Sequence, residues 1–139
     1  MIEARLVRAP ISGEALLRAV ASHAHGASAL FLGTVREQNQ GRPVEGIDYS
    51  AYEPMAEREM ARILAEARDR HHVAALVLEH RLGTLGLGEV SVAVAAADPR
   101  RAPALDALRY VVEELKRRVP IWKREHYADG TREWVDPTR

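Results

Sequence analysis

The sequence predicts an α+β fold in which three main helices pack against a mixed or antiparallel sheet. Two observations support this prediction: three segments carry apolar residues at helical spacing, and several shorter segments are continuously apolar or alternate as strands do. Glycine and proline separate most of these segments. The 139 residues have the length of one domain, 1–139, and a hydrophobic fraction of 47% is enough for a core.

The first third of the chain places a helix between strands. Residues 2–7 are expected to form the first strand, and Ser12 can cap a helix over 14–22. Residues 27–35 include three consecutive large apolar side chains, which indicates a mostly buried strand. Residues 44–52 alternate roughly as a strand does, and we expect this strand to pair with the one before it.

The middle of the chain predicts a helix followed by a hairpin. Pro54 suits the first turn of a helix that runs to about His71, with one apolar and one charged face. Residues 73–79 and 90–97 have the composition of strands, and three glycines between 83 and 88 indicate the turn that joins them into a hairpin.

The longest and clearest helix follows the hairpin. Asp98 is expected to cap this helix, Pro99 takes its first position, and Pro120 ends it. Its apolar stripe consists of Leu105, Leu108, Val112, Leu115 and Val119. The remaining residues, 121–139, contain a turn at 129–130 and can form a last strand.

Composition and charge exclude several classes of protein. The 20 basic and 20 acidic residues cancel, so the net charge favours neither nucleic acid nor an anionic membrane surface as a partner. The first residues lack the apolar segment of a signal peptide and no apolar run is long enough to span a membrane, so we expect a cytoplasmic protein. Without cysteine the chain has no thiolate nucleophile, and any sulfur chemistry must use sulfur brought by another molecule.

Both lysines of the chain, Lys116 and Lys123, flank Pro120, whereas the other 18 basic residues are arginines. Two explanations stay open. A general bias toward arginine can leave two lysines in one basic segment by chance. Alternatively, the protein keeps lysine where it needs an amine that can lose its proton and act as a nucleophile or proton carrier, which arginine cannot do.

The segment 100–124 is basic, with eight basic and three acidic residues. Arg100 and Arg101 lie in the first turn of the long helix, where free backbone N–H groups and the helix dipole favour a phosphate. Lys116 lies about 24 Å away along the same helix. Either there are two sites, or a dimer brings the helix start of one subunit to the helix end of the other, and we favour the dimer.

Other common site motifs are absent from the sequence. The histidines lack the companion ligands that a zinc site needs, so we expect no metal. Neither a P-loop nor a G-x-G-x-x-G motif is present, which excludes the usual nucleotide cofactors, and we expect no cofactor. The serines in strand contexts lack a nucleophile-elbow motif, so a serine hydrolase has little support.

Three motifs are specific enough to compare with known families: FLGTVR at 31–36, HRLG at 80–83 with a following Gly-Glu at 88–89, and LKRRVPIWKRE at 115–125. Together they resemble the MoaE family, the large catalytic subunits of molybdopterin synthase. The resemblance runs in order from about residue 26 to 135 and implies an α/β-hammerhead-type fold and a homodimer. It also implies that each protomer binds one small ubiquitin-like subunit, which carries sulfur as a C-terminal Gly-Gly thiocarboxylate, to make a heterotetramer.

The resemblance further implies the activity and its residues. Two sulfur transfers convert cyclic pyranopterin monophosphate into the dithiolene of molybdopterin, a step of molybdenum cofactor biosynthesis. Lys116 is implied as the main catalytic lysine and Lys123 as the second. The remaining implied site residues are Thr34, Val35, Arg36, Arg124 and Glu125. Arg101 matches an arginine that reaches in from the other subunit, and Arg100 stands where the family commonly has histidine, so a proton-transfer role is excluded there.

We expect Arg36, Arg100 and Arg101 to bind the phosphate through charge-assisted hydrogen bonds. Lys116 can act as a general acid or base or hold an intermediate covalently, and Trp122 can be either a wall of the site or a core aromatic residue.

A second class of function is a non-catalytic module that holds a phosphorylated ligand or RNA on 100–124. The aromatic content of 5% and the zero net charge argue against RNA. A pure scaffold for a ubiquitin-like partner leaves the lysines unexplained.

Overall fold

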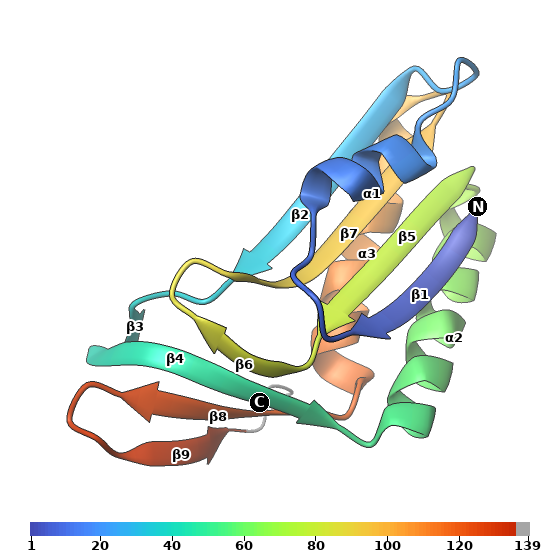
Figure 1. Ribbon diagram of the computed structural model, residues 1–139. Coiled ribbons are helices and arrows are strands. Elements are labelled where there is room, and N and C mark those ends of the chain that lie inside the picture. The colour runs from blue at the N-terminus through green and yellow to red at the C-terminus, as the bar shows by residue number, and fades with distance from the viewer. Residues whose placement is uncertain (136–139) are drawn as a thin grey trace.

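The computed structural model describes residues 1–135, which form three helices and two sheets (Figure 1). The α+β class predicted from the sequence is confirmed. In chain order the elements are β1 (Ile2–Val7), α1 (Gly13–Val20), β2 (Ala27–Thr34), β3 (Gln38–Asn39), β4 (Arg42–Ala51), α2 (Glu53–His71), β5 (Ala75–Arg81), β6 (Gly83–Gly86), β7 (Val90–Asp98), α3 (Arg101–Arg118), β8 (Ile121–Tyr127) and β9 (Arg132–Val135).

The first sheet has four strands in the order β1-β5-β7-β2. It is mixed, because β1 runs parallel to β5 while β5–β7 and β7–β2 are antiparallel, so the predicted hairpin partners do pair. Helix α1 lies on one face of this sheet, and α2 and α3 cover the other (Figure 1). Strand β7 is buried on both faces: Val92, Val94 and Ala96 pack toward α2 and α3, and Ala93, Ala95 and Ala97 pack toward α1.

Helix α3 buries the predicted stripe only in part, with Leu108 and Val112 half-buried against the core. The helix turns Ala104, Ala107 and Val111 into the core, whereas Leu105 is 54% exposed. Small side chains let the helix backbone approach the sheet closely, so the most deeply buried face lies one position away from the large apolar residues of the stripe. The C-terminal part of the stripe, at Leu115 and Val119, is buried as predicted.

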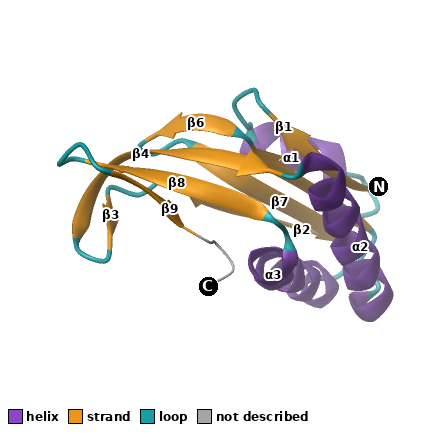
Figure 2. Cartoon of the chain, turned by 90° about the horizontal axis from the view of Figure 1, so that it is seen from below, coloured by secondary structure: helices purple, strands orange, loops and turns teal. Residues whose placement is uncertain are grey.

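The second sheet is antiparallel, in the order β3-β4-β8-β9, with β6 also paired to β4. The predicted pairing of β4 with β2 is therefore wrong. The segment 83–88 is also more than a turn, because its first four residues form β6. Gly46 allows β6 to approach, since a Cβ there would lie 2.9 Å from the Leu85 carbonyl oxygen. Figure 2 shows this sheet extending away from the helices.

The predicted cap of the long helix is also corrected. Arg100 is the N-cap residue of α3, and its side chain makes no capping hydrogen bond. Asp98 instead ends β7, and its buried carboxylate accepts hydrogen bonds of 3.0 Å from the backbone N–H groups of Ala74 and Arg100. The carboxylate thus ties the end of β7 to the start of β5. The expected turn at 129–130 joins β8 to β9, with Gly130 at φ +89°.

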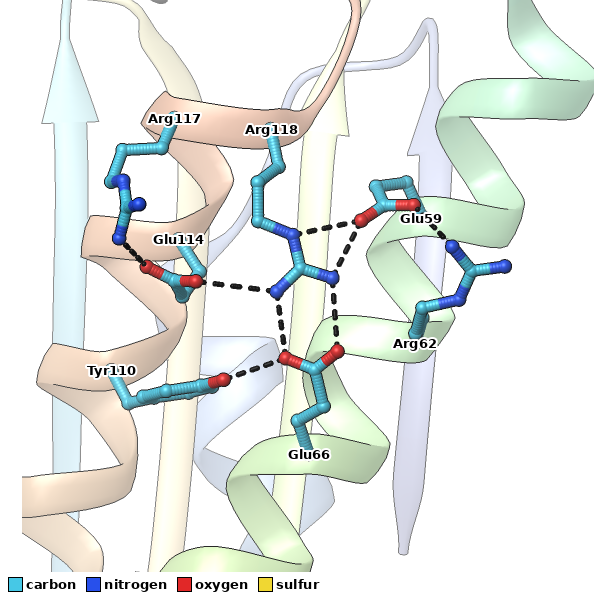
Figure 3. Close-up of polar contacts among 7 residues, drawn as sticks. All are labelled: Glu59, Arg62, Glu66, Tyr110, Glu114, Arg117 and Arg118. Carbon is cyan, nitrogen blue, oxygen red and sulfur yellow. Dashed lines mark hydrogen bonds and ion pairs between the residues drawn. The ribbon is translucent and has the colours of Figure 1, made fainter.

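Helices α2 and α3 are joined by a polar network at the C-terminal end of α3. Arg118 donates hydrogen bonds to Glu59 and Glu66 of α2 and to Glu114 of its own helix (Figure 3). The chain then turns at Pro120 directly into β8. The network therefore fixes the end of α3, from which the chain enters the second sheet.

Candidate active site

A cavity of about 480 Å³ lies where the end of α3 meets the second sheet. A smaller hollow of about 330 Å³ adjoins it. Seven residues line both: Arg36, Asn39, Tyr49, Ser91, Val92, Lys116 and Lys123. We call the two spaces together the α3–β8 cleft. Three of these residues carry cationic side chains, so the cleft suits an anionic ligand.

Both lysines reach the α3–β8 cleft, from different elements. Lys116 lies in the last turn of α3, and Lys123 is the third residue of β8. The turn at Pro120 reverses the chain between them, so two side chains seven positions apart line one space. Within residues 1–135, Lys116 has no ion-pair partner, whereas the Nζ of Lys123 lies 3.2 Å from Oε1 of Glu125.

Glu125 holds Lys123 from a buried position. Its side chain is only 2% exposed, and its Oε2 accepts hydrogen bonds of 2.7 Å from both Tyr127 Oη and Asn39 Nδ2. Burial raises the pKa of Glu125, but these hydrogen bonds and the charge of Lys123 outweigh burial and hold the pKa below its usual value. Glu125 is therefore an anion whose second oxygen fixes the lysine.

Sequence reasoning missed Asn39, His80 and Tyr49 as members of this site. Asn39 stood in an expected loop, because nothing local in the sequence marks the short pairing of β3 with β4. His80 stands in the HRLG motif, which carried a resemblance but no role. Tyr49 was expected only as a strand residue, and its place in the cleft depends on how the second sheet docks on the first.

Two of the three predicted site residues of the 31–36 motif line the cleft, and the third is buried in the core. Arg36, just after β2, lines both parts of the cleft, and Thr34 lines the smaller part. The Val35 side chain is instead buried in the core of the second sheet beside Val44 and Leu85. Its backbone N–H and C=O bond to Glu89 and Gly88, so Val35 contributes to the position of its neighbours rather than to the lining.

Arg124 does not line the cleft within this chain. It lies between Lys123 and Glu125 on β8, so the alternation of a strand turns its side chain to the opposite face. There its Nε and Nη2 donate to Oδ2 of Asp48 at 3.0 and 2.7 Å. Burial raises the pKa of Asp48, but hydrogen bonds from His126, Arg124 and Thr84 outweigh burial and lower the pKa to about 2.

Trp122 takes neither of the two roles left open for it. It directly precedes Lys123 on β8, so its side chain points to the opposite face of the strand. Trp122 is 47% exposed and belongs neither to the lining of the cleft nor to a core cluster. The strand alternation that carries Arg124 away from the cleft also carries Trp122 away.

Arg100 and Arg101 lie at the other end of α3 from Lys116. They line a separate hollow of about 540 Å³ together with Gly26, Ala27, Pro99 and Ala102. One chain therefore does not bring them to the cleft, as the length of the helix predicted. In the described part of the chain, no group of three or more metal-ligating side chains is gathered, and none of its helices is long and apolar enough to cross a membrane.

Comparison with known proteins identifies the family. The MoaE protein family matches residues 6–118. A molybdopterin synthase catalytic subunit of Oryza sativa subsp. indica is 49% identical over 120 residues, which cover 83% of this chain and 62% of that protein. One of Bacillus subtilis (strain 168) is 38% identical over 130 residues, covering 94% of this chain and 82% of that protein. The chain thus spans less than two thirds of the rice relative.

Solved structures agree with the sequence relatives. The crystal structure of molybdopterin synthase from Staphylococcus aureus superposes with a TM-score of 0.87 at 34% identity, covering 94% of each chain. The MoaE protein of Burkholderia ambifaria MC40-6 superposes with a TM-score of 0.85 at 30% identity, covering 100% of this chain and 92% of that one. With the family match extending over most of its length, the chain belongs to the MoaE family.

Proposed function

We propose that this chain is the catalytic subunit of a molybdopterin synthase. It transfers sulfur from the C-terminal thiocarboxylate of a small ubiquitin-like subunit to cyclic pyranopterin monophosphate, and two transfers give the dithiolene of molybdopterin. The observation that carries the proposal is the convergence of Lys116, Lys123 and Arg36 on one cleft. The absence of cysteine fits a reaction in which the partner brings the sulfur.

The cleft offers separate tasks to its two amines. Lys123 is anchored by buried Glu125, which suits it to hold an anionic group of the substrate or the thiocarboxylate. Lys116 has no such anchor among residues 1–135, so its amine is available to transfer a proton or to hold an intermediate covalently. In each transfer the partner's sulfur forms a carbon–sulfur bond on the substrate while a carbon–oxygen bond of the substrate breaks, in one of the two transfers the bond to the cyclic phosphate, which opens. Water then cleaves the bond between the sulfur and the partner's acyl carbon and releases the partner's C-terminus as a carboxylate.

The proposed assembly is a homodimer within a heterotetramer. Arg100 and Arg101 are exposed at the far end of α3, and in the dimer they would complete the other subunit's cleft by binding the substrate phosphate. Subunits 1 and 2 of the molybdopterin-converting factor of Helicobacter pylori 26695 form a protein–protein complex, and a chain of that complex shares this fold with a TM-score of 0.79 at 22% identity. We take the cytoplasm as the compartment of the reaction.

A single-turnover assay tests the proposal. The reconstituted complex with a thiocarboxylated small subunit is given cyclic pyranopterin monophosphate, and molybdopterin is measured for the wild type, Lys116→Ala and Lys116→Arg. Product from the wild type and loss in both variants is expected, because arginine keeps the charge but not a titratable amine. Arg117→Ala is the matched control, since its side chain is 72% exposed one position away.

Two results would count against the proposal. Full activity of Lys116→Arg would remove the requirement for an amine. No product from a folded, partner-bound wild type would reject the synthase and leave a non-catalytic module that holds a phosphorylated ligand.

A further inference from the structure

His80 is a buried titratable residue whose ring borders the α3–β8 cleft. It is the sixth residue of β5 and is only 7% exposed, yet it lines the larger cavity together with Lys116 and Lys123. Tyr49 packs against it edge to face, with ring centroids 5.2 Å apart. The proposed sulfur transfer uses none of the atoms of this ring.

The contacts of His80 determine which of its nitrogens carries hydrogen. Nδ1 lies 2.9 Å from the carbonyl oxygen of Arg81. Because a carbonyl oxygen only accepts hydrogen bonds, Nδ1 carries the hydrogen, and in a neutral ring Nε2 then holds a lone pair. Within residues 1–135, Nε2 has no hydrogen-bond partner, and it is not among the fully enclosed atoms that lack one, so it stays open to the cavity.

The surroundings of His80 keep its ring neutral. Burial lowers its pKa to about 4. The other titratable or charged groups that line the same cavity are the phenol of Tyr49 on β4 and the cations Arg36, Lys116 of α3 and Lys123 of β8. Nearby positive charges disfavour a further one, and the described residues place no carboxylate against the ring. Such a weak base is better suited to accepting a hydrogen bond than to removing a proton.

We propose that His80 is a specificity-determining residue of this site, whose Nε2 accepts a hydrogen bond from an N–H or O–H group of the bound substrate. The inference rests on the proposed function in taking the cleft as the substrate site. The three cations are donors only and attract the anionic part of a ligand. A neutral His80 adds an acceptor beside them, which selects heterocycles or polyols that carry both an anionic group and a hydrogen-bond donor.

The first test does not depend on activity. Nitrogen-15 NMR of the histidine side chains in the purified wild-type protein reports which ring nitrogen is protonated. We expect His80 to carry hydrogen on Nδ1 alone between pH 5.5 and 8. A ring protonated on both nitrogens at pH 7, or one protonated on Nε2 alone, would overturn the inference.

The second test measures binding of cyclic pyranopterin monophosphate to the reconstituted complex by calorimetry. His80→Phe keeps a planar aromatic ring and removes the acceptor, and we expect it to weaken binding roughly 10- to 100-fold, because the ligand donor loses its partner on leaving water. His80→Gln places an amide oxygen near the position of Nε2 and is expected to stay within a few-fold of the wild type. His23→Gln, at an exposed position, is the matched control.

The outcomes separate this inference from the proposed function. Equal affinity of His80→Phe and the wild type overturns the role of His80 and leaves the synthase intact. A folded wild-type complex that binds no substrate overturns both. Thermal unfolding of every variant checks folding, and if His80→Phe does not fold, His80→Asn replaces it. The shorter amide of asparagine does not reach the position of Nε2, so its binding must then be weaker than that of His80→Gln.

Discussion

Arg118 and Glu66 bind each other through two parallel hydrogen bonds, from Nη1 to Oε1 at 2.6 Å and from Nη2 to Oε2 at 2.9 Å (Figure 3). The same guanidinium also binds Glu59 and Glu114, which pair in addition with Arg62 and Arg117. Arg118 lies two residues beyond Lys116 in the last turn of α3. The pair therefore fixes the helix end that carries an amine of the candidate active site.

Removing Arg118 is expected to destabilise the fold. Arg118→Ala leaves Glu66 without its guanidinium partner and takes one of two cations from Glu59 and Glu114, which keep Arg62 and Arg117. We expect the free energy of unfolding to fall by about 2–4 kcal/mol. Urea titration measures the change. Arg117→Ala serves as the control and should stay within about 0.5 kcal/mol, because Arg117 is a solvent-exposed partner of Glu114. Equal effects of the two variants would show that the network contributes nothing beyond surface charge.

Glu66 gives the protein a defined sensitivity to acid. Hydrogen bonds from Arg118 and Tyr110 lower its pKa from 4.5 to about 2 in the folded state. A carboxylate whose folded pKa is depressed stabilises the fold fully above its unfolded pKa, and the contribution is lost as pH falls through the folded pKa. We expect stability to fall between pH 5 and pH 2 less steeply in Glu66→Gln than in the wild type. Chemical denaturation over this range, followed by circular dichroism, tests the slope.

Glu125 is expected to affect the reaction more than the fold. In Glu125→Gln an uncharged amide faces Lys123, and the amine loses the anion that anchors it. We expect the single-turnover rate to fall roughly 10- to 100-fold, while the free energy of unfolding falls by about 1–2 kcal/mol. Glu133→Gln on β9, with an exposed side chain, is the control. A normal rate in Glu125→Gln would mean that Lys123 needs no anchor.

A site shared between subunits predicts complementation. Lys116→Ala and Arg101→Ala are each expected to lower activity strongly as homodimers. If Arg101 completes the cleft of the other subunit, each mixed dimer contains one intact and one doubly defective site. Equal mixing after subunit exchange should therefore restore about a quarter of wild-type activity. No recovery, with mixed dimers present by mass spectrometry, would mean that Arg101 does not complete the cleft of the other subunit.

The local sequence pattern was enough to predict most helices and strands and to single out both lysines as candidate site residues. Helix α3 and its C-terminal end follow from apolar spacing and Pro120, whereas its start lies two residues after the predicted Pro99; Lys116 and Lys123 stand out in a chain otherwise rich in arginine. The predicted pairing of β4 with β2 was wrong, because the actual partner, β8, lies about seventy residues later and no local signal specifies so distant a pairing.

The site was predicted less completely than the fold. Arg124 matched a motif that extends along one strand, and a strand sends neighbouring side chains to opposite faces, so the motif includes residues that do not share a space. His80 and Asn39 join the cleft only through tertiary contacts. Burial and strand docking decide such membership, and neither is readable from residue type.

The α3–β8 cleft takes Lys116 from a helix packed on the mixed sheet and Lys123 from the antiparallel sheet. The spacing of the two amines is consequently set by neither sheet alone. A folding intermediate with both sheets formed but undocked would hold both lysines and still lack the cleft. The cleft thus requires docking of the two sheets, and recovery of activity during refolding should lag behind recovery of secondary structure.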